Sequence, residues 1–222
     1  MKRHREPELM DDPTLPRAEH ERALRGLARL NFVGGAARMI WPEVRRELQS
    51  HGDLSVVDVA CGGGDVLCDI VRRGRGRIRA LGLDISETAV ARAGRSAPRG
   101  VRFARLDVLR APLPKADIVM CSLFLHHLDP AEVVALLGRM KSAARRTVIV
   151  SDLERSPAAR WGVGMASRIL TRSRVVHVDG DRSVRAAYTR SELLALAERA
   201  GLHGARVERR QPFRMLLIWS GN

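Results

Sequence analysis

The strongest constraint on the fold is a short apolar run that leads into three consecutive glycines. Residues 55–60 read SVVDVA, a pattern typical of a buried strand, and Cys61 and the glycines at 62–64 follow directly. Residues 66–71 then repeat apolar side chains at helical spacing, which predicts a helix. A strand that turns through glycines into a helix opens the kind of sheet whose ligand crevice lies at the carboxyl ends of its strands.

Strand and helix patterns alternate along the rest of the chain. Further strands are predicted over residues 78–85, 101–107, 117–122 and 147–152, with a closing hairpin over 205–210 and 215–220. Two helical stretches are predicted over residues 17–50, joined at Gly34 and Gly35, and a third helix over 87–95 after a Ser86 cap. A further helix is predicted to begin at Asp129 and Pro130, and a last one to run from a capping box at Thr189 and Glu192 to Gly201. The alternation predicts an α/β fold with one doubly wound sheet, mostly parallel with an antiparallel C-terminal hairpin strand, and helices on both faces.

The 222 residues have the length of one domain. We expect a flexible N-terminus over residues 1–16, a helical lid over 17–50 and the main domain over 51–222. The polar N-terminus is not followed by the apolar run of a secretion signal, and no apolar run is long enough to cross a bilayer. The three cysteines form no CxxC pair, which predicts a reducing compartment and argues against disulfides and a zinc site. Together these features predict a cytoplasmic protein.

The formal net charge of +14 comes almost entirely from arginine, because Lys2, Lys115 and Lys141 are the only lysines. A basic balance is compatible with a nucleic acid, an anionic membrane surface or an acidic substrate as partner. The arginines are spread through every segment without a long basic tract, and aromatic residues make up only 4% of the chain. Two interpretations stay open, a solvated basic surface and a functional anionic partner.

A carboxylate closes the second predicted strand at Asp84, 22 residues after Gly62. At this spacing a carboxylate can accept both hydroxyls of a ribose. A dinucleotide-binding loop would require a third glycine where the chain has Leu67, and Tyr188 is not followed by the lysine of a Tyr-x-x-x-Lys pair. The pattern therefore favours a nucleoside ligand other than a nicotinamide dinucleotide.

These segments resemble the class I S-adenosylmethionine-dependent methyltransferases, a Rossmann-like family. The resemblance to their glycine-rich first motif rests on Asp58, Ala60, Cys61, Gly62 and Gly64, with Ala60 in place of the first glycine. The later motifs are matched by Asp84 and Ile85, by Asp107 and Val108, and by residues 117–122, which end in Cys121 and Ser122.

The resemblance implies S-adenosylmethionine as the cofactor and assigns each motif a part of it. Asp84 would bind the ribose and Ile85 would pack on the adenine, while Asp107 and Val108 would meet the adenine amino group and ring. The end of the fourth strand would lie beside the methionine moiety. Residues 51–222 would then form the methyltransferase domain, with residues 17–50 as its lid.

Two adjacent histidines, His126 and His127, follow the fourth predicted strand, near the expected position of the methyl group. One of them is a candidate general base for an oxygen nucleophile, because an unperturbed imidazole has a pKa of about 6.5. Packing at the entrance to the next helix is the alternative for the pair. Asp152 ends the fifth strand and either faces the crevice or caps a loop. Nothing in the sequence requires a metal, although some O-methyltransferases use magnesium.

The acceptor is expected to be a small molecule. An N-terminal helical pair that ends in MIWP, the HHL motif, and the segment before YTRSELLALAERAGL resemble bacterial methyltransferases of quinone, phenolic-lipid or polyketide pathways. This weaker resemblance implies O-methylation of an aromatic or polyketide-like hydroxyl and allows peripheral contact with a lipid-like substrate. Residues 157–170, PAARWGVGMASRIL, form either an apolar pocket wall or an ordinary packed helix.

Two other functions remain as alternatives. The first is an RNA or protein methyltransferase that uses the basic surface. Against a nucleic-acid partner, the fourth strand ends in CSLF instead of the Asn/Asp-Pro-Pro-Tyr/Phe motif of nitrogen-methylating enzymes, and no RNA-binding module is recognisable. The second is a non-catalytic module that binds S-adenosylmethionine.

Overall fold

A seven-stranded sheet forms the centre of the structure, a computed structural model that describes residues 1–12 and 14–221. Its strands are β1 (Leu54–Val59), β2 (Ile78–Asp84), β3 (Val101–Arg105), β4 (Ala116–Ser122), β5 (Ala144–Leu153), β6 (Arg206–Arg210) and β7 (Arg214–Ser220). They lie in the order β3-β2-β1-β4-β5-β7-β6, and β7 runs antiparallel to both of its neighbours while the other pairs are parallel. This confirms the predicted α/β sheet with an antiparallel C-terminal hairpin.

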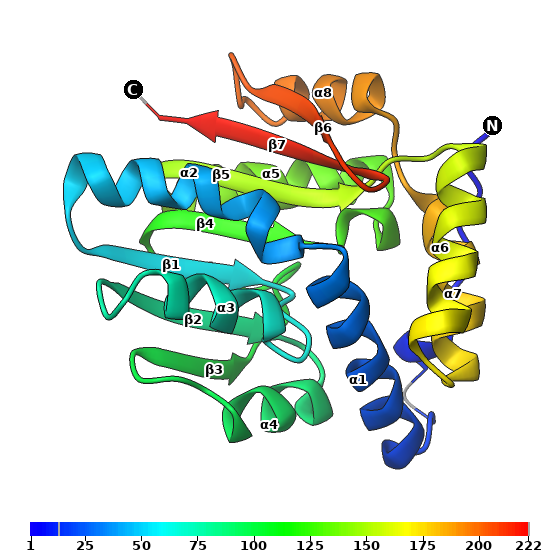
Figure 1. Cartoon of the computed structure of the whole chain (residues 1–222). Helices are drawn as coiled ribbons and strands as arrows, with labels where there is room; N and C mark the ends of the chain where they lie inside the picture. The colour runs from blue at the N-terminus through cyan, green and yellow to red at the C-terminus, as the bar shows by residue number, and fades with distance from the viewer. Residues whose placement is uncertain (13, 222) are drawn as a thin grey trace.

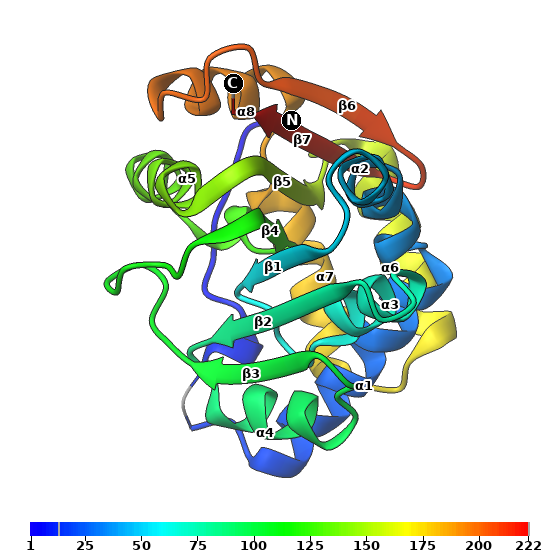
Figure 2. The same cartoon turned by 90° about the vertical axis from the view of Figure 1, so that its left-hand side faces the viewer.

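Helices cover both faces of the sheet. They are α1 (Arg17–Val33), α2 (Ala36–His51), α3 (Asp65–Arg73), α4 (Glu87–Arg95), α5 (Pro130–Ala143), α6 (Pro157–Leu170), α7 (Arg174–Ala186) and α8 (Arg190–Arg199), with short turns η1 (Leu9–Asp11) and η2 (Leu125–His127). Figure 2 shows the sheet between α2 and α3 on one side and α5 on the other. Buried side chains such as Ile40 and Leu67 form the core on the first side, and Leu136 and Leu193 contribute to the core on the second.

Local signals in the sequence set the starts of three helices. Ser86 accepts a hydrogen bond from the backbone of Ala89 and caps α4. Capping boxes are present at Asp129 for α5 and at Thr189 for α8. Each of these helices therefore begins where the sequence predicts it.

The carboxyl ends of the parallel strands face three helices that lie beside the edge of the sheet. In Figure 1 the arrowheads of β1, β2, β4 and β5 point toward α1, α6 and α7. The sequence left residues 157–170 open between a pocket wall and a packed helix, and it did not predict α7. In α7, Val175, Val176 and Val184 are buried, so packing stabilises a helix that its β-branched residues and a glycine do not favour locally.

The N-terminal segment differs from the expectation of a flexible residue range 1–16. The backbone N–H of His4 donates to the carbonyl of Arg185, and those of Leu9 and Met10 donate to the two oxygens of Asp179, at 2.8 and 3.1 Å. Residues 1–12 are thus attached to α7, through partners so distant in the sequence that composition could not reveal them. Position 13 of the predicted range lies outside the described residues.

Across residues 1–12 and 14–221, none of the helices combines the length and the apolar character that crossing a membrane requires.

Candidate cofactor and acceptor site

A cavity of about 910 Å³ lies at the carboxyl ends of β1, β2 and β4. The glycine loop, α1 and the N-terminal segment contribute to its walls. Most of the residues that the sequence predicts to bind a cofactor line it, namely Asp58, Ala60, Cys61, Gly62, Asp84, Ile85, Asp107, Val108 and Ser122. Gly64 and Cys121 are outside the lining, and no residue of α6 belongs to it. Cys121 is fully buried in the core beneath the cavity.

The glycine loop has a left-handed backbone at alternate positions. Ala60, Gly62 and Gly64 have φ values of 56°, 53° and 74°. A Cβ at Gly62 would meet no protein atom within 4 Å, so this position opens into the cavity, whereas a Cβ at Gly64 would lie 2.5 Å from the ring of Phe103. Gly62 thus leaves room for a ligand, and Gly64 leaves room for packing. Ala60 takes the left-handed conformation without the freedom of glycine, which costs about 1–2 kcal/mol.

Asp84 links the glycine loop to the start of α4 by hydrogen bonds. Its Oδ2 accepts the backbone N–H of Gly62 and its Oδ1 accepts that of Ser86, both at 2.8 Å. Burial raises the pKa of Asp84, while the two backbone hydrogen bonds act to lower it. A carboxylate oxygen has two lone pairs, so each oxygen can still accept a hydrogen bond from a ligand in the cavity.

A second carboxylate, that of Asp58, lies buried at the base of the loop. Its Oδ1 and the Oγ of Ser122 are buried and have no hydrogen-bond partner among the described residues. Burial raises the pKa of Asp58 well above its usual range, and the charges of Asp65 and Asp84 add to this effect. Buried polar atoms are normally paired, so unpaired atoms that line a cavity indicate a ligand that completes them.

A hydrogen-bonded chain of three side chains supports the loop from the other side, and the sequence did not single it out. Asn31 of α1 donates to Asp65 at 2.9 Å, and Arg214 of β7 donates to Asn31 at 2.8 Å. Burial lowers the pKa of Arg214 to about 10, so its guanidinium stays charged at neutral pH. These residues are far apart in the sequence and follow no motif, so only the folded structure brings them together.

The residues predicted to meet an adenine ring lie along one wall. Ile85 has 60% of its surface exposed and lines the cavity, as does the buried Val108. Asp107 accepts the backbone N–H of Leu109 at 3.0 Å, which fixes the turn after β3. An exposed isoleucine and a buried valine in the lining of the same cavity provide apolar surface where a flat ring can pack.

His126, one of the two candidate bases, is buried and paired on both sides. Its Nδ1 lies 2.6 Å from Asp152 Oδ1, its backbone N–H donates to Asp152 Oδ2 at 3.1 Å, and its Nε2 lies 3.6 Å from Glu8 Oε1. Burial acts to lower the pKa of His126, but Asp152 and Glu8 raise it to about 10. His126 does not line the cavity. Asp152 is turned toward His126, which answers the question that the sequence left open for this carboxylate.

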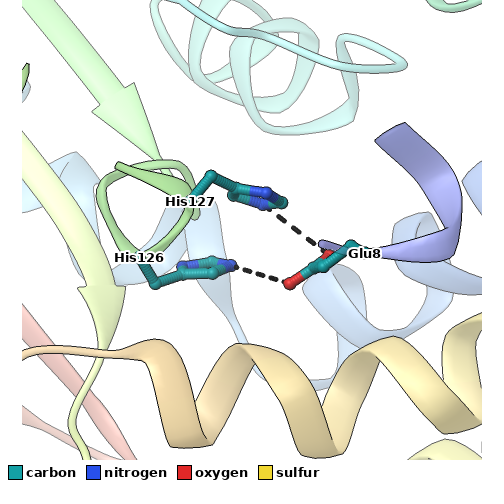
Figure 3. Close-up of side chains that lie close together, drawn as sticks. All are labelled: Glu8, His126 and His127. Atoms are coloured by element: carbon teal, nitrogen blue, oxygen red, sulfur yellow. Dashed lines mark ion pairs between the residues drawn. The ribbon is translucent and has the colours of Figure 1, made fainter. Parts of the chain in front are cut away.

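His127 lies on the cavity wall and is the member of the pair that can reach an acceptor. Its Nδ1 is 3.0 Å from Asp11 and its Nε2 is 3.7 Å from Glu8 Oε2. Figure 3 shows both histidines converging on Glu8 of the N-terminal segment. The sequence indicated no metal ligand and did not single out Glu8, yet the ligand atoms of Glu8, His126 and His127 lie within 4.8 Å of one another.

Residues 56–147 match the family model described as a methyltransferase domain. This part of the chain is similar to a methyltransferase domain. The matched range begins in β1 and ends in β5, so it contains the glycine loop, Asp84, Asp107 and both histidines. No curated protein matches the chain in sequence.

Solved structures share the fold of this chain. Human N-acetylserotonin methyltransferase in complex with S-adenosylmethionine has a TM-score of 0.66 at 17% identity, covering 93% of this chain and 57% of its own. A protein from Nostoc punctiforme assigned as an O-methyltransferase has a TM-score of 0.65 at 18% identity, covering 91% of this chain and 61% of its own. Magnesium protoporphyrin IX methyltransferase from Synechocystis, with bound S-adenosylhomocysteine, has a TM-score of 0.55 at 18% identity, covering 92% of this chain and 84% of its own.

At these identities the likeness concerns the fold. The chain spans about three fifths of the length of the first two structures.

The cofactor of this family is S-adenosylmethionine, and the cavity of this chain fits it. The cofactor carries a ribose diol, an adenine ring and two positive centres, an ammonium and a sulfonium. The cavity offers the free lone pairs of Asp84, the apolar surface of Ile85, the unpaired oxygen of Asp58 and open space over Gly62. The positive centres suit a wall rich in carboxylates.

Proposed function

We propose that the protein transfers a methyl group from S-adenosylmethionine to a hydroxyl oxygen of a small aromatic or polyketide-like acceptor. The observation that carries the proposal is one continuous cavity, which has the Asp84–Gly62 contact on one wall and His127 on another. Its volume of about 910 Å³ is at the upper end of the usual range for ligand pockets, so it has room for a cofactor and an acceptor together.

Bound S-adenosylmethionine supplies an activated methyl group on a sulfonium. In the proposal, Asp84 binds the ribose hydroxyls and Ile85 packs on the adenine. Asp58 and Asp65 lie at the methionine end of the cavity, where the positive centres of the bound cofactor would favour their ionised forms. Alignment of the acceptor oxygen with the methyl group is the main task left to the protein, and positioning of this kind contributes about 7–11 kcal/mol. Of the two histidines predicted as candidate general bases, we assign this role to His127, because only His127 lines the cavity.

The charge of the cavity favours a small molecule over a nucleic acid. Glu8, Asp11 and Asp12 line it on the side of the N-terminal segment, in a chain with a formal net charge of +14. Carboxylates at this position would repel a phosphate backbone, whereas the phosphate contacts of nucleic-acid-binding proteins come mainly from arginine and lysine. Trp161 and Ile169 of α6, with 72% and 73% of their surface exposed, lie outside the cavity lining and could make only peripheral contact with a lipid-like acceptor.

The test is a turnover assay with S-adenosylmethionine and a panel of phenols, quinols and polyketide-like aromatics. Mass spectrometry is used to detect S-adenosylhomocysteine and the methylated product. We expect both to form with at least one hydroxylated acceptor, and to be lost in Asp84→Ala. Stabilisation in a thermal-shift assay by NAD alone would contradict the proposal, and so would S-adenosylmethionine binding without turnover on any acceptor.

Methylation of RNA or protein in the same assay would support the alternative acceptor class. The salt dependence of binding distinguishes an RNA acceptor from a small-molecule acceptor, because phosphate contacts make the affinity for RNA fall steeply with ionic strength.

A further inference from the structure

We propose that Glu8, His126 and His127 bind one divalent transition-metal ion, of which Zn²⁺ is an example. The three residues come from two distant parts of the chain, the N-terminal segment and the turn η2 after β4. Ion binding stands independently of the methyl-transfer reaction. Any role of the ion in holding the acceptor rests on the proposed function, and with the ion bound His127 is a metal ligand and no longer a free general base.

The spacing of the ligand atoms suits one ion. The Nε2 atoms of His126 and His127 lie 3.6 and 3.7 Å from the two oxygens of Glu8. These distances exceed the roughly 2.7–3.2 Å of a direct N–H···O hydrogen bond, so neither Nε2 atom is directly hydrogen-bonded to the carboxylate of Glu8. Two ligand atoms that each lie about 2.1 Å from one tetrahedral ion are about 3.4 Å apart. Each of these histidine–carboxylate separations is therefore close to that of two ligands on a shared ion, and one ligand atom from each of the three residues lies within 4.8 Å of the others.

The other ring nitrogen of each histidine is held by a carboxylate. Nδ1 of His126 lies 2.6 Å from Asp152, and Nδ1 of His127 lies 3.0 Å from Asp11. Metal-binding histidines almost always donate this second nitrogen to a carboxylate, carbonyl or water, which directs the remaining lone pair at the ion. Both members of the pair have this arrangement, which holds the two imidazoles in the orientation that a metal site uses.

Glu8 is also fixed in orientation. The hydroxyl of Ser183 in α7 donates to Glu8 Oε1, and the neighbouring Leu9 is held by Asp179. Three carboxylates, those of Glu8, Asp11 and Asp152, surround the two imidazoles. This excess of negative charge favours a cation there, either the proton on His126 or a metal ion that replaces it.

The ligand set indicates the class of metal. Two imidazoles with one carboxylate suit zinc, iron, cobalt or nickel, whereas magnesium and calcium prefer oxygen ligands alone. Three protein ligands leave at least one coordination position free. Because Glu8 and His127 line the cavity, this position faces the space assigned to the acceptor, where an acceptor oxygen could bind.

The experiment uses the full chain, treated with a chelator and dialysed. Co²⁺ is titrated and followed by its visible absorption, and Zn²⁺ is titrated by calorimetry. We expect saturation at one ion per chain. Glu8→Gln and His127→Asn should each weaken binding at least about tenfold, and Asp11→Asn, which keeps all three ligands, should weaken it less.

A matched control is available on the surface. His203 and Glu198 form an exposed pair 2.9 Å apart, away from the cavity. His203→Asn should leave the titration unchanged. Circular dichroism and urea unfolding verify that each variant is folded, and Asp11→Asn keeps the test usable if a ligand variant does not fold.

Absence of one-to-one binding in the wild type would overturn the metal site. Equal affinities in the wild type, Glu8→Gln and His127→Asn would also overturn it, as would tighter binding of Mg²⁺ than of Co²⁺. Binding of S-adenosylmethionine to the same metal-free samples is measured in parallel. Failure there would count against the proposed function and leave the metal result standing.

Discussion

The carboxylate of Asp84 accepts the backbone N–H of Gly62 at 2.8 Å, which joins the end of β2 to the loop that follows β1. One side chain thereby shapes the loop and offers its remaining lone pairs to the cavity. The neighbouring parallel strands β1 and β2 both end at this side of the sheet, and their register pairs Asp58 with Gly82 and Val59 with Leu83.

Asp84→Asn should weaken binding of S-adenosylmethionine by about 10- to 100-fold. The amide keeps the size of the carboxylate but loses its charge, and its nitrogen cannot accept one of the two backbone N–H groups, a combined loss of about 1.5–3 kcal/mol. Isothermal titration calorimetry measures the change. Glu87→Gln, on the cavity rim at the start of α4, serves as the control and should bind as the wild type does. Unchanged affinity in Asp84→Asn would remove this residue from the cofactor site.

Asp58→Asn should stabilise the protein without ligand, and more so at pH 8 than at pH 5. Burial raises the pKa of Asp58 well above the unfolded value of about 3.9. Above pH 4 the unfolded chain releases this proton more readily than the folded chain does, so the carboxyl costs increasing stability as the pH rises toward its folded pKa. The asparagine variant removes this cost, and we expect a gain of about 1–2 kcal/mol at pH 8.

Urea unfolding of both proteins at the two pH values measures the difference. The same variant should bind S-adenosylmethionine more weakly, since an asparagine cannot ionise when the positively charged cofactor binds. A stability difference that stays constant from pH 5 to pH 8 would mean that Asp58 is charged in the folded protein.

Ala60→Gly and Gly62→Ala should have opposite effects. Both positions have a positive φ, 56° and 53°. Glycine at 60 relieves the left-handed strain of alanine, for a gain of about 0.5–1 kcal/mol after its greater chain entropy. Alanine at 62 adds a similar strain, and its Cβ points into open space in the cavity, so it should also weaken cofactor binding. Thermal unfolding and calorimetry on the two variants test both statements, and a destabilised Ala60→Gly would contradict the first.

Asn31→Ala should destabilise the fold by about 1–2 kcal/mol, because it leaves both Asp65 and Arg214 without their shared partner. Urea unfolding gives the magnitude. A double-mutant cycle with Asp65→Asn should show a coupling energy above about 0.5 kcal/mol, as expected for residues in one hydrogen-bonded chain. Additive effects would show that the chain does not act as a unit.

The sequence predicted those parts of the structure that local patterns specify. The strand before the glycine loop, β1, carries β-branched residues, and α4, α5 and α8 begin at capping residues, so the order of elements followed from short segments. The glycine loop and Asp84 could be found in the same way, because a fixed spacing along the chain brings them together.

The part of the site formed by the N-terminal segment and the two histidines could not be found from local patterns. Asp11 and His127 are 116 residues apart, and Glu8 reaches the histidines from a polar segment whose composition indicates flexibility. For His126, adjacency to His127 suggested two candidate bases. His126 is buried and paired with Asp152, whereas His127 lines the cavity, and this difference depends on tertiary packing.

The attachment of residues 1–12 to α7 has a practical consequence for anyone who produces this protein. The carbonyl of Met1 accepts a hydrogen bond from Arg155 at 2.9 Å, so a purification tag joined directly to the amino terminus would compete with contacts that hold Glu8 and Asp11 in the cavity wall. In Figure 1 the opposite terminus emerges from β7 on the far side of the sheet, where an added sequence would leave that wall undisturbed.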